Sequence, residues 1–269
     1  SIPDNDVLDI GDSDFSIQFN LKCSDSDRSH LLSKSPVVEQ DGGEYGAYYF
    51  IHLKSNGTIE FEITDGYSGS GDYSIVTGNI EVNDNQWHHV AVLFDRDDNG
   101  YIYIDGNLDA SGSIASHPGS LANNEPLEIG VDFELGSHYL DGKLDNISFW
   151  DYVLTYSEIQ SFVVAPPTGN EIGLIGYWNF NEGSGTNLTD QTSNSNNGTI
   201  NGATWSTDVP TTSTTWPDAD YQNVADQLII SCECSRDTKL RSLKLCLSEV
   251  HLLVAKSASS PWFALSVGT

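Results

Sequence analysis

Basic residues are scarce in this sequence. It has 11 Lys and Arg against 39 Asp and Glu, which gives a net charge of −28. Because polyphosphate binding depends on Lys and Arg displacing counterions, we expect no nucleic-acid partner, and the same charge repels anionic lipid. High acidic content is typical of proteins exposed to salty water, such as those of a marine bacterium, and it supplies oxygen ligands for calcium.

Long apolar runs are also missing. No stretch of about 18 apolar residues occurs, so we predict no membrane insertion. The first residues, Ser1-Ile2-Pro3-Asp4, show neither the basic nor the apolar region of a signal peptide. We interpret the N-terminus as cut from a longer secreted or cell-surface protein, whose other domains would be covalently attached partners.

Cysteines and nucleophile motifs are few. Three of the four cysteines lie beyond residue 220, and Cys232-x-Cys234 is spaced too closely for a zinc knuckle. Gly-x-Ser-x-Gly, His-Glu-x-x-His and phosphate-binding glycine loops are absent. The sequence therefore favours neither a disulfide framework in its main part nor nucleophile-based hydrolysis.

Alternating apolar and polar residues are abundant. Such period-two patterns predict strands with one face on a core and the other toward water. Asn56-Gly57 between two of these segments is a strong hairpin indicator. The expected strand segments are 15–21, 45–53, 58–63, 74–82, 87–94, 101–105, 127–130 and 141–150. The fold class is therefore all-β and antiparallel.

One short helix is expected. Thr155-Tyr156-Ser157-Glu158 places a hydroxyl and a carboxylate three residues apart, which is the pattern of a capping box. The helix would run through Phe162.

Four motifs in the strand region carry a family resemblance. They are Trp87-x-His89-Val90-Ala91, Tyr103-x-Asp105-Gly106, Ile129-Gly130 and Gly142-x-x-Asp145 followed by Trp150. In this order they resemble the laminin-G-like (concanavalin A-like) jelly-roll domains of secreted bacterial multidomain proteins. The resemblance covers residues 1–165 and implies an antiparallel β-sandwich. It also implies a glycan-binding or adhesive module, because only some relatives are enzymes.

Composition divides the chain further. Residues 166–170 form a Pro/Gly linker, and 171–206 look like the opening strands of a second laminin-G-like repeat. That segment is either a truncated repeat or the strand that completes the first sandwich, whose unpaired edge it could cover. Residues 207–220 form a Thr/Pro spacer. Residues 221–269, leucine-rich and glycine-poor, are a tail of unknown origin that is either disordered, out of frame or artificial, or a real element.

Aromatic residues beside acidic ones are the candidate ligand-binding set. Pyranose rings stack on aromatic faces by their C–H face while their hydroxyls pair with polar groups at the rim. We expect a Tyr-lined loop surface made of Tyr45, Tyr48, Tyr67, Tyr73, Asp132, Glu134, His138 and Tyr139. Tyr at strand ends is also ordinary β composition, which is the alternative for each of them.

The family resemblance also implies a structural calcium ion. It matches Asp145 on the closing strand, with Asp190 and Asn197 as partners, because carboxylate, Asx and carbonyl oxygens can supply the six to eight ligands that calcium takes. The alternative is that Asp145 caps backbone amides.

Catalysis has weak support. Laminarinase-type jelly rolls place Glu-x-Asp-x-Glu on one strand, and Glu128, Asp132 and Glu134 share a strand parity but not that spacing. We therefore expect no enzyme.

The predicted function is reversible docking of polysaccharide, neutral slightly favoured over anionic, by a non-catalytic carbohydrate-binding or adhesive module. The alternatives are a jelly-roll glycoside hydrolase or lyase, and a structural spacer or protein-adhesion domain.

Overall fold

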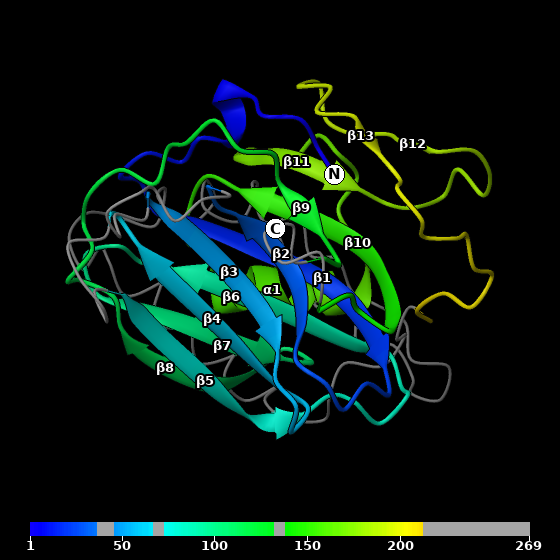
Figure 1. Cartoon of the computed structure of the whole chain (residues 1–269), viewed down its shortest axis with the longest axis horizontal. Helices are drawn as coiled ribbons and strands as arrows, with labels where there is room; N and C mark the ends of the chain where they lie inside the picture. Colours follow the sequence, from blue (N-terminus) through cyan, green and yellow to red (C-terminus); the bar gives the residue numbers. More distant parts are fainter. Residues whose placement is uncertain (37–45, 67–72, 132–137, 212–269) are drawn as a thin grey trace, which may run out of the picture. The chain divides into compact units, whose positions relative to one another are not determined.

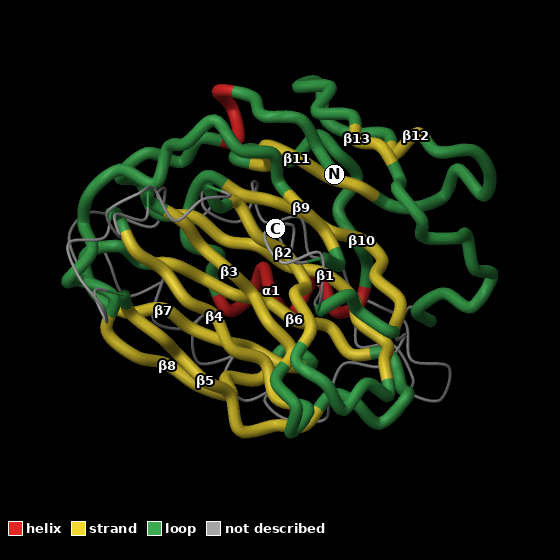
Figure 2. Tube along the Cα trace, in the orientation of Figure 1, coloured by secondary structure: helices red, strands yellow, loops and turns green. Residues whose placement is uncertain are grey.

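The strands follow the period-two pattern of the sequence. The computed structural model describes residues 1–36, 46–66, 73–131 and 138–211. Figures 1 and 2 show their elements. In chain order the strands are β1 (Phe15–Cys23), β2 (Ser29–Lys34), β3 (Tyr48–Leu53), β4 (Thr58–Thr64), β5 (Ser74–Glu81), β6 (His88–Phe94), β7 (Asn99–Ile104), β8 (Asn107–Ser113), β9 (Glu128–Ile129), β10 (Gly142–Trp150), β11 (Leu174–Trp178), β12 (Asn187–Leu188) and β13 (Gly198–Thr199). The helical elements are the 3-10 turn η1 (Asp6–Leu8) and α1 (Tyr156–Val164).

Two antiparallel sheets form the sandwich. The larger has the order β11-β10-β1-β6-β7-β8, and the other has the order β5-β4-β3-β2-β9. Strands β12 and β13 make a small pair of their own. The predicted fold class, an antiparallel β-sandwich with one short α-helix, is confirmed for the residues that the structure describes.

Aromatic rings from both sheets meet in the core. Phe15 of β1 stacks on Phe94 of β6 with ring centroids 4.1 Å apart, and Tyr49 of β3 lies 5.3 Å from Phe15. Phe61 of β4 meets Phe94 edge-on at 4.8 Å. All four rings are at most 1 % exposed. Burial of each such side chain contributes roughly 1.5–3 kcal/mol, so the sheets are held by the period-two apolar positions.

Helix α1 covers the opposite face of the larger sheet (Figure 2, red). Its Ile159 is fully buried and its Phe162 lies 5.0 Å from the ring of Trp150. The capping box is confirmed, because Thr155 Oγ1 accepts from Glu158 N and Glu158 Oε2 accepts from Thr155 N. No helical segment in the described ranges is long and apolar enough to cross a membrane.

Residues after the Pro/Gly linker pair with the sheet of the first 165 residues. Strand β11 lies beside β10, with Trp178 opposite Ile147, and the Trp178 side chain is fully buried. Further along, Asp208 accepts hydrogen bonds from Lys143 and Trp87 and forms an ion pair with Lys22. The remaining proposed boundaries stay predictions, and residues 212–269 lie outside the described residues.

The alternating sequence pattern did not predict two of the strands, β2 and β8. Strand β2 contains a register shift between His30 and Leu32, so both Leu31 and Leu32 are buried in succession and the alternation breaks. Strand β8 is a mostly exposed edge strand whose polar residues resemble a loop. The predicted strand 45–53 begins at Tyr48 in the structure.

Truncation tests the role of β11. A chain ending at residue 170 exposes the β10 edge and leaves the buried place of Trp178 empty, so we expect it to aggregate or to lose cooperative unfolding. A chain ending at residue 211 should keep the urea midpoint of the full chain. Equal midpoints for all three chains would contradict this account.

Candidate functional site

Polar residues of β2 to β5 gather on the face of the smaller sheet that points away from the core. Tyr49 and Ile51 of β3 pack inward, so the alternating Phe50 and His52 point to the other side. The register then lines up residues of neighbouring strands in cross-strand rows. One row is His30, His52, Glu60 and Thr77, and the next is Ser33, Phe50, Glu62 and Ile75. These eight residues, with Tyr48, are named the outer face.

Burial decreases across the outer face from β2 toward β5. His52 is 1 % exposed and Glu60 is 7 % exposed, which is unusual for polar side chains outside a core. Phe50 and Glu62 are half-buried, whereas Thr77 is exposed and Ile75 is 43 % exposed. The accessible part of the outer face therefore runs from Phe50 of β3 over Glu62 of β4 to β5.

The two glutamates of β4 have different partners. Glu60 Oε2 accepts from Lys54 Nζ at 2.7 Å and from Thr77 Oγ1 at 2.5 Å. Glu62 Oε1 accepts from Tyr48 Oη at 2.5 Å. Burial raises the pKa of Glu62 despite this hydrogen bond, and the neighbouring Glu60 charge raises it further. The face thus holds one ion-paired carboxylate beside one that protonates more readily.

His52 is held as a neutral imidazole. Its Nδ1 lies 3.0 Å from Nε and 2.7 Å from Nη2 of Arg28, and a guanidinium can only donate. Burial, followed by the charges of His30 and Arg28, lowers the pKa of His52 to about 2. The proton of the neutral ring therefore sits on Nε2, a buried atom with no hydrogen-bond partner in the described part of the chain. A buried N–H donor without a partner is costly, so it favours a bound acceptor.

Phe50 is the aromatic centre of the outer face. Its ring lies 4.6 Å from Tyr48, 5.2 Å from His30 and 5.5 Å from His52, between centroids. These contacts surround a half-buried phenyl ring with donors and acceptors.

The structure separates the predicted Tyr-lined loop surface into two ends. Tyr48 is a buried strand residue and not a loop residue, and it pairs with Thr64. Tyr73, 39 % exposed, precedes Ser74, which pairs with Ile63 at the same end of β4.

His138 and Tyr139 lie at the other end of the sheet. The carbonyl of Tyr139 accepts from Ser29 Oγ, and Ser29 pairs with Leu53, the last residue of β3. At about 3.4 Å per residue, the length of β3 puts roughly 17 Å between the two ends. Tyr139 is 63 % exposed. Tyr45, Tyr67, Asp132 and Glu134 lie outside the described residues.

Comparison with known protein families identifies the family to which this β-sandwich belongs. A family model, Laminin_G_3 of the concanavalin A-like lectin/glucanases superfamily, matches residues 1–160. The chain belongs to the Laminin_G_3 family. The resemblance noted in the sequence is thereby confirmed.

Similar sequences and structures occur in other proteins. A rat protein, "Sushi, von Willebrand factor type A, EGF and pentraxin domain-containing protein 1", is 27 % identical over 146 residues, which are 50 % of this chain and 4 % of that protein. A candidate carbohydrate binding protein from Bacteroides ovatus has a TM-score of 0.53 and 18 % identity, over 70 % of this chain and 52 % of that one. The CBM40 of Ruminococcus gnavus IT-sialidase, bound to α2,3 sialyllactose, has a TM-score of 0.44 and 14 % identity, over 55 % and 80 %.

Two of the three predicted calcium residues, Asp190 and Asn197, lie beyond the residues that the family model matches, and protein groups already bind their side-chain oxygens. Asp190 Oδ1 accepts from the amides of Tyr177 and Thr192, and Oδ2 accepts from Thr192 Oγ1 and Asn196 N. These four donors fill its lone pairs. Asn197 Oδ1 accepts from Asp190 N.

Asp145 is a separate feature on β10. Its Oδ1 accepts from Asn146 N, and burial raises its pKa to about 6. Over the described ranges, no three His, Cys, Asp or Glu side chains gather to hold a metal. Calcium at Asp145, Asp190 and Asn197 stays a sequence prediction.

Only Glu128 of the predicted carboxylate cluster lies within the described residues. Glu128 of β9 is 7 % exposed, lies beside Ser33, and is 4.0 Å from the N-terminal ammonium. Asp132 and Glu134 lie outside the described residues, so their shared role is untested.

Sequence reasoning missed Arg28, Phe50, His52, Glu60 and Glu62. Glu60-x-Glu62 and Phe50-x-His52 each share one face of a strand, which was visible in the sequence. The missing information was the pairing of β3 with β2 and β4, which brings these residues into rows.

The neutral His52 predicts a pH dependence of stability. Its folded pKa lies below the ordinary value of 6.5, so unfolding takes up a proton at pH values between the two. The stability that it contributes is complete above about pH 6.5 and is lost as pH falls through the acidic range. In urea unfolding between pH 6 and 4, wild type should lose stability more steeply than His52→Gln, by at most about 1.4 kcal/mol per pH unit. Parallel pH profiles would contradict a neutral His52.

Proposed function

We propose that this chain is a non-catalytic carbohydrate-binding module of a secreted or cell-surface protein, and that saccharide docks on the accessible part of the outer face. The observation that carries the proposal is the half-buried Phe50 ring between the Glu62 carboxylate and the Arg28–His52 pair. Sugar sites need such an aromatic face with polar groups at its rim. Membership of a lectin/glucanase superfamily supports the same class of ligand.

The polar groups suit the hydroxyls of a neutral glycan. The Glu62 carboxylate can accept hydrogen bonds from sugar hydroxyls, and the Thr77 hydroxyl can accept or donate them. The Arg28 guanidinium can donate hydrogen bonds to the same hydroxyls. Tyr73 offers a further exposed ring at the far end of the face. Two carboxylates on the face and a net charge of −28 disfavour an anionic polysaccharide. We therefore propose neutral polysaccharide as the partner.

Attachment to a larger protein is part of the proposal. The matched segment of the rat relative is 4 % of a protein whose name includes several domain types. A module of this kind anchors its parent to glycan.

A glycan array tests the site. Phe50→Ala should weaken binding at least about fivefold, because ring stacking contributes about 1 kcal/mol beyond area burial. Tyr156→Ala, on the exposed side of α1, is the matched control and should bind as wild type does. Loss of binding in Tyr139→Ala with unchanged binding in Phe50→Ala would move the site to the other end of the sheet. Failure of wild type on every glycan would favour a structural spacer or a protein-adhesion domain.

Glycoside hydrolysis is the second candidate, because Glu60 and Glu62 share one strand face and the pKa of Glu62 is raised. A raised pKa suits a general acid. If the domain only binds, reducing-sugar assays on a polysaccharide panel should show no product from wild type. Product formation by wild type that Glu62→Gln abolishes would instead establish an enzyme.

A further inference from the structure

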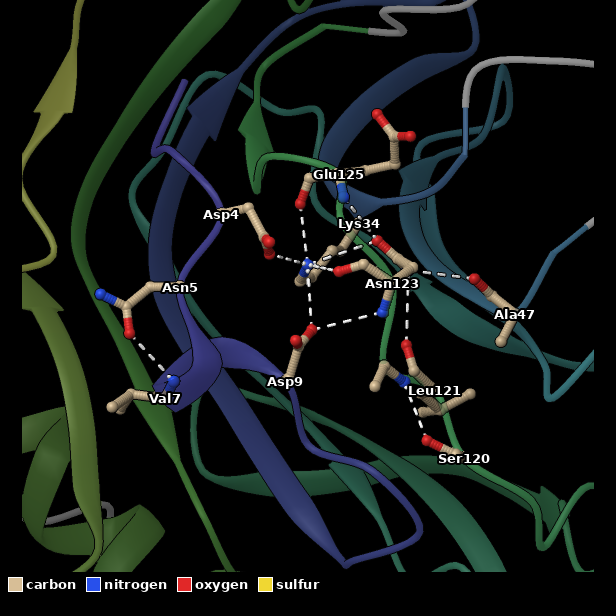
Figure 3. Close-up of polar contacts among 11 residues, drawn as sticks. Asp4, Asn5, Val7, Asp9, Lys34, Ala47, Ser120, Leu121, Asn123 and Glu125 are labelled. Atoms are coloured by element: carbon tan, nitrogen blue, oxygen red, sulfur yellow. Dashed lines mark hydrogen bonds and ion pairs between the residues drawn. The ribbon is translucent and has the colours of Figure 1, made fainter.

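A lysine ammonium lies buried in a cage of oxygen atoms (Figure 3). Lys34 is 1 % exposed. Its Nζ lies 2.7 Å from Asp4 Oδ1, 2.7 Å from the carbonyl of Asn123 and 2.7 Å from the carbonyl of Glu125. Asp9 Oδ1 at 3.2 Å and Asn123 Oδ1 at 3.3 Å complete the shell. These four residues around Lys34 are named the oxygen cage.

The ammonium matches this cage poorly in two respects. An ammonium has three N–H donors, whereas the five surrounding oxygens all lie within reach of them. It also carries one positive charge against the two carboxylates of Asp4 and Asp9. A divalent cation would balance that charge and could contact every oxygen at once.

The donor types are those that calcium takes. Calcium binds six to eight oxygens drawn from carboxylates, backbone carbonyls, Asn side chains and water, at 2.3–2.6 Å. The oxygen cage offers the first three types, and a contraction of a few tenths of an ångström would bring its closest atoms into range. Magnesium needs a tighter, near-octahedral shell, which five preset protein oxygens suit less well.

The cage is held by contacts that do not involve Lys34. Asn123 Nδ2 donates to the carbonyls of Ala47 and Leu121, and Asn123 Oδ1 accepts from Glu125 N. Asn123 N also donates to Asp9 Oδ1. On the N-terminal segment, Asn5 caps η1 between the two aspartates. The oxygens of Asp9, Asn123 and Glu125 are therefore held near one another without the lysine side chain.

We propose that the oxygen cage is by its chemistry a calcium site, which this chain fills with its own tethered cation, Lys34. In the native domain, Lys34 therefore links the N-terminal segment, β2 and the loop before β9, and the oxygen cage holds no metal ion. Removal of the ammonium opens the cage to calcium. The proposal does not depend on glycan binding.

Thermal unfolding of the full chain tests the proposal, with calcium chloride, magnesium chloride or chelator as the added reagent. Wild type should have the same Tm in calcium and in chelator. Lys34→Ala should lower the Tm in chelator by roughly 10 °C, because the buried lysine stem is removed and the partly exposed carboxylates of Asp4 and Asp9 lose their partner. Calcium at about 100 times its Kd should then return about 5–10 °C, and magnesium much less.

Two further variants keep the result interpretable. Lys34→Met fills the space with an apolar chain, so calcium should not restore its Tm. Adding Asp9→Asn to Lys34→Ala removes one carboxylate and should weaken calcium binding at least tenfold, as measured by calorimetry. If Lys34→Ala does not fold in chelator, recovery of folding in calcium alone supports the proposal. Lys34→Ala that neither folds nor binds calcium, or a wild-type Tm that chelator lowers, would overturn it.

Discussion

The contact between Phe15, Phe94 and Tyr49 across the two sheets determines the rest of the structure. It fixes which side of β3 faces inward, because Tyr49 has to meet the stacked pair of Phe15 and Phe94. With period two, Phe50 and His52 then have to point outward. Antiparallel pairing carries the same choice into β4 and sends Glu60 and Glu62 to the same side. The candidate site is thus a consequence of core packing.

Basic residues act as internal cross-links in this acidic chain. Lys34 and Arg96 are each 1 % exposed and bind backbone carbonyls of neighbouring loops. Lys22 and Lys143 both contact Asp208, and Lys54 contacts Glu60. Arg28 binds His52. Every Lys and Arg in the described residues therefore has a defined contact with an acidic group, a histidine or a backbone carbonyl.

Local patterns predicted most of the fold. Strands with regular alternation and the capping box at Thr155 depend on neighbours in sequence, so they were accessible without coordinates. Strand β2 was not, because its bulge at Leu31 removes the alternation. The site was harder still. Aromatic residues near acidic ones in sequence suggested one surface in and beside the loops, yet Tyr48 and Tyr139 are at opposite ends of the sheet. The rows of the outer face arise from pairing between distant segments, which composition and spacing do not encode.

Backbone and side-chain NMR of the full chain during titration with a bound neutral oligosaccharide tests the account most directly. The outer face predicts shifts at the Phe50 ring, the Glu62 and Thr77 amides and the His52 Nε2–H proton. Shifts confined to the Tyr139 ring, with an unchanged Phe50 ring and His52 proton, would contradict it.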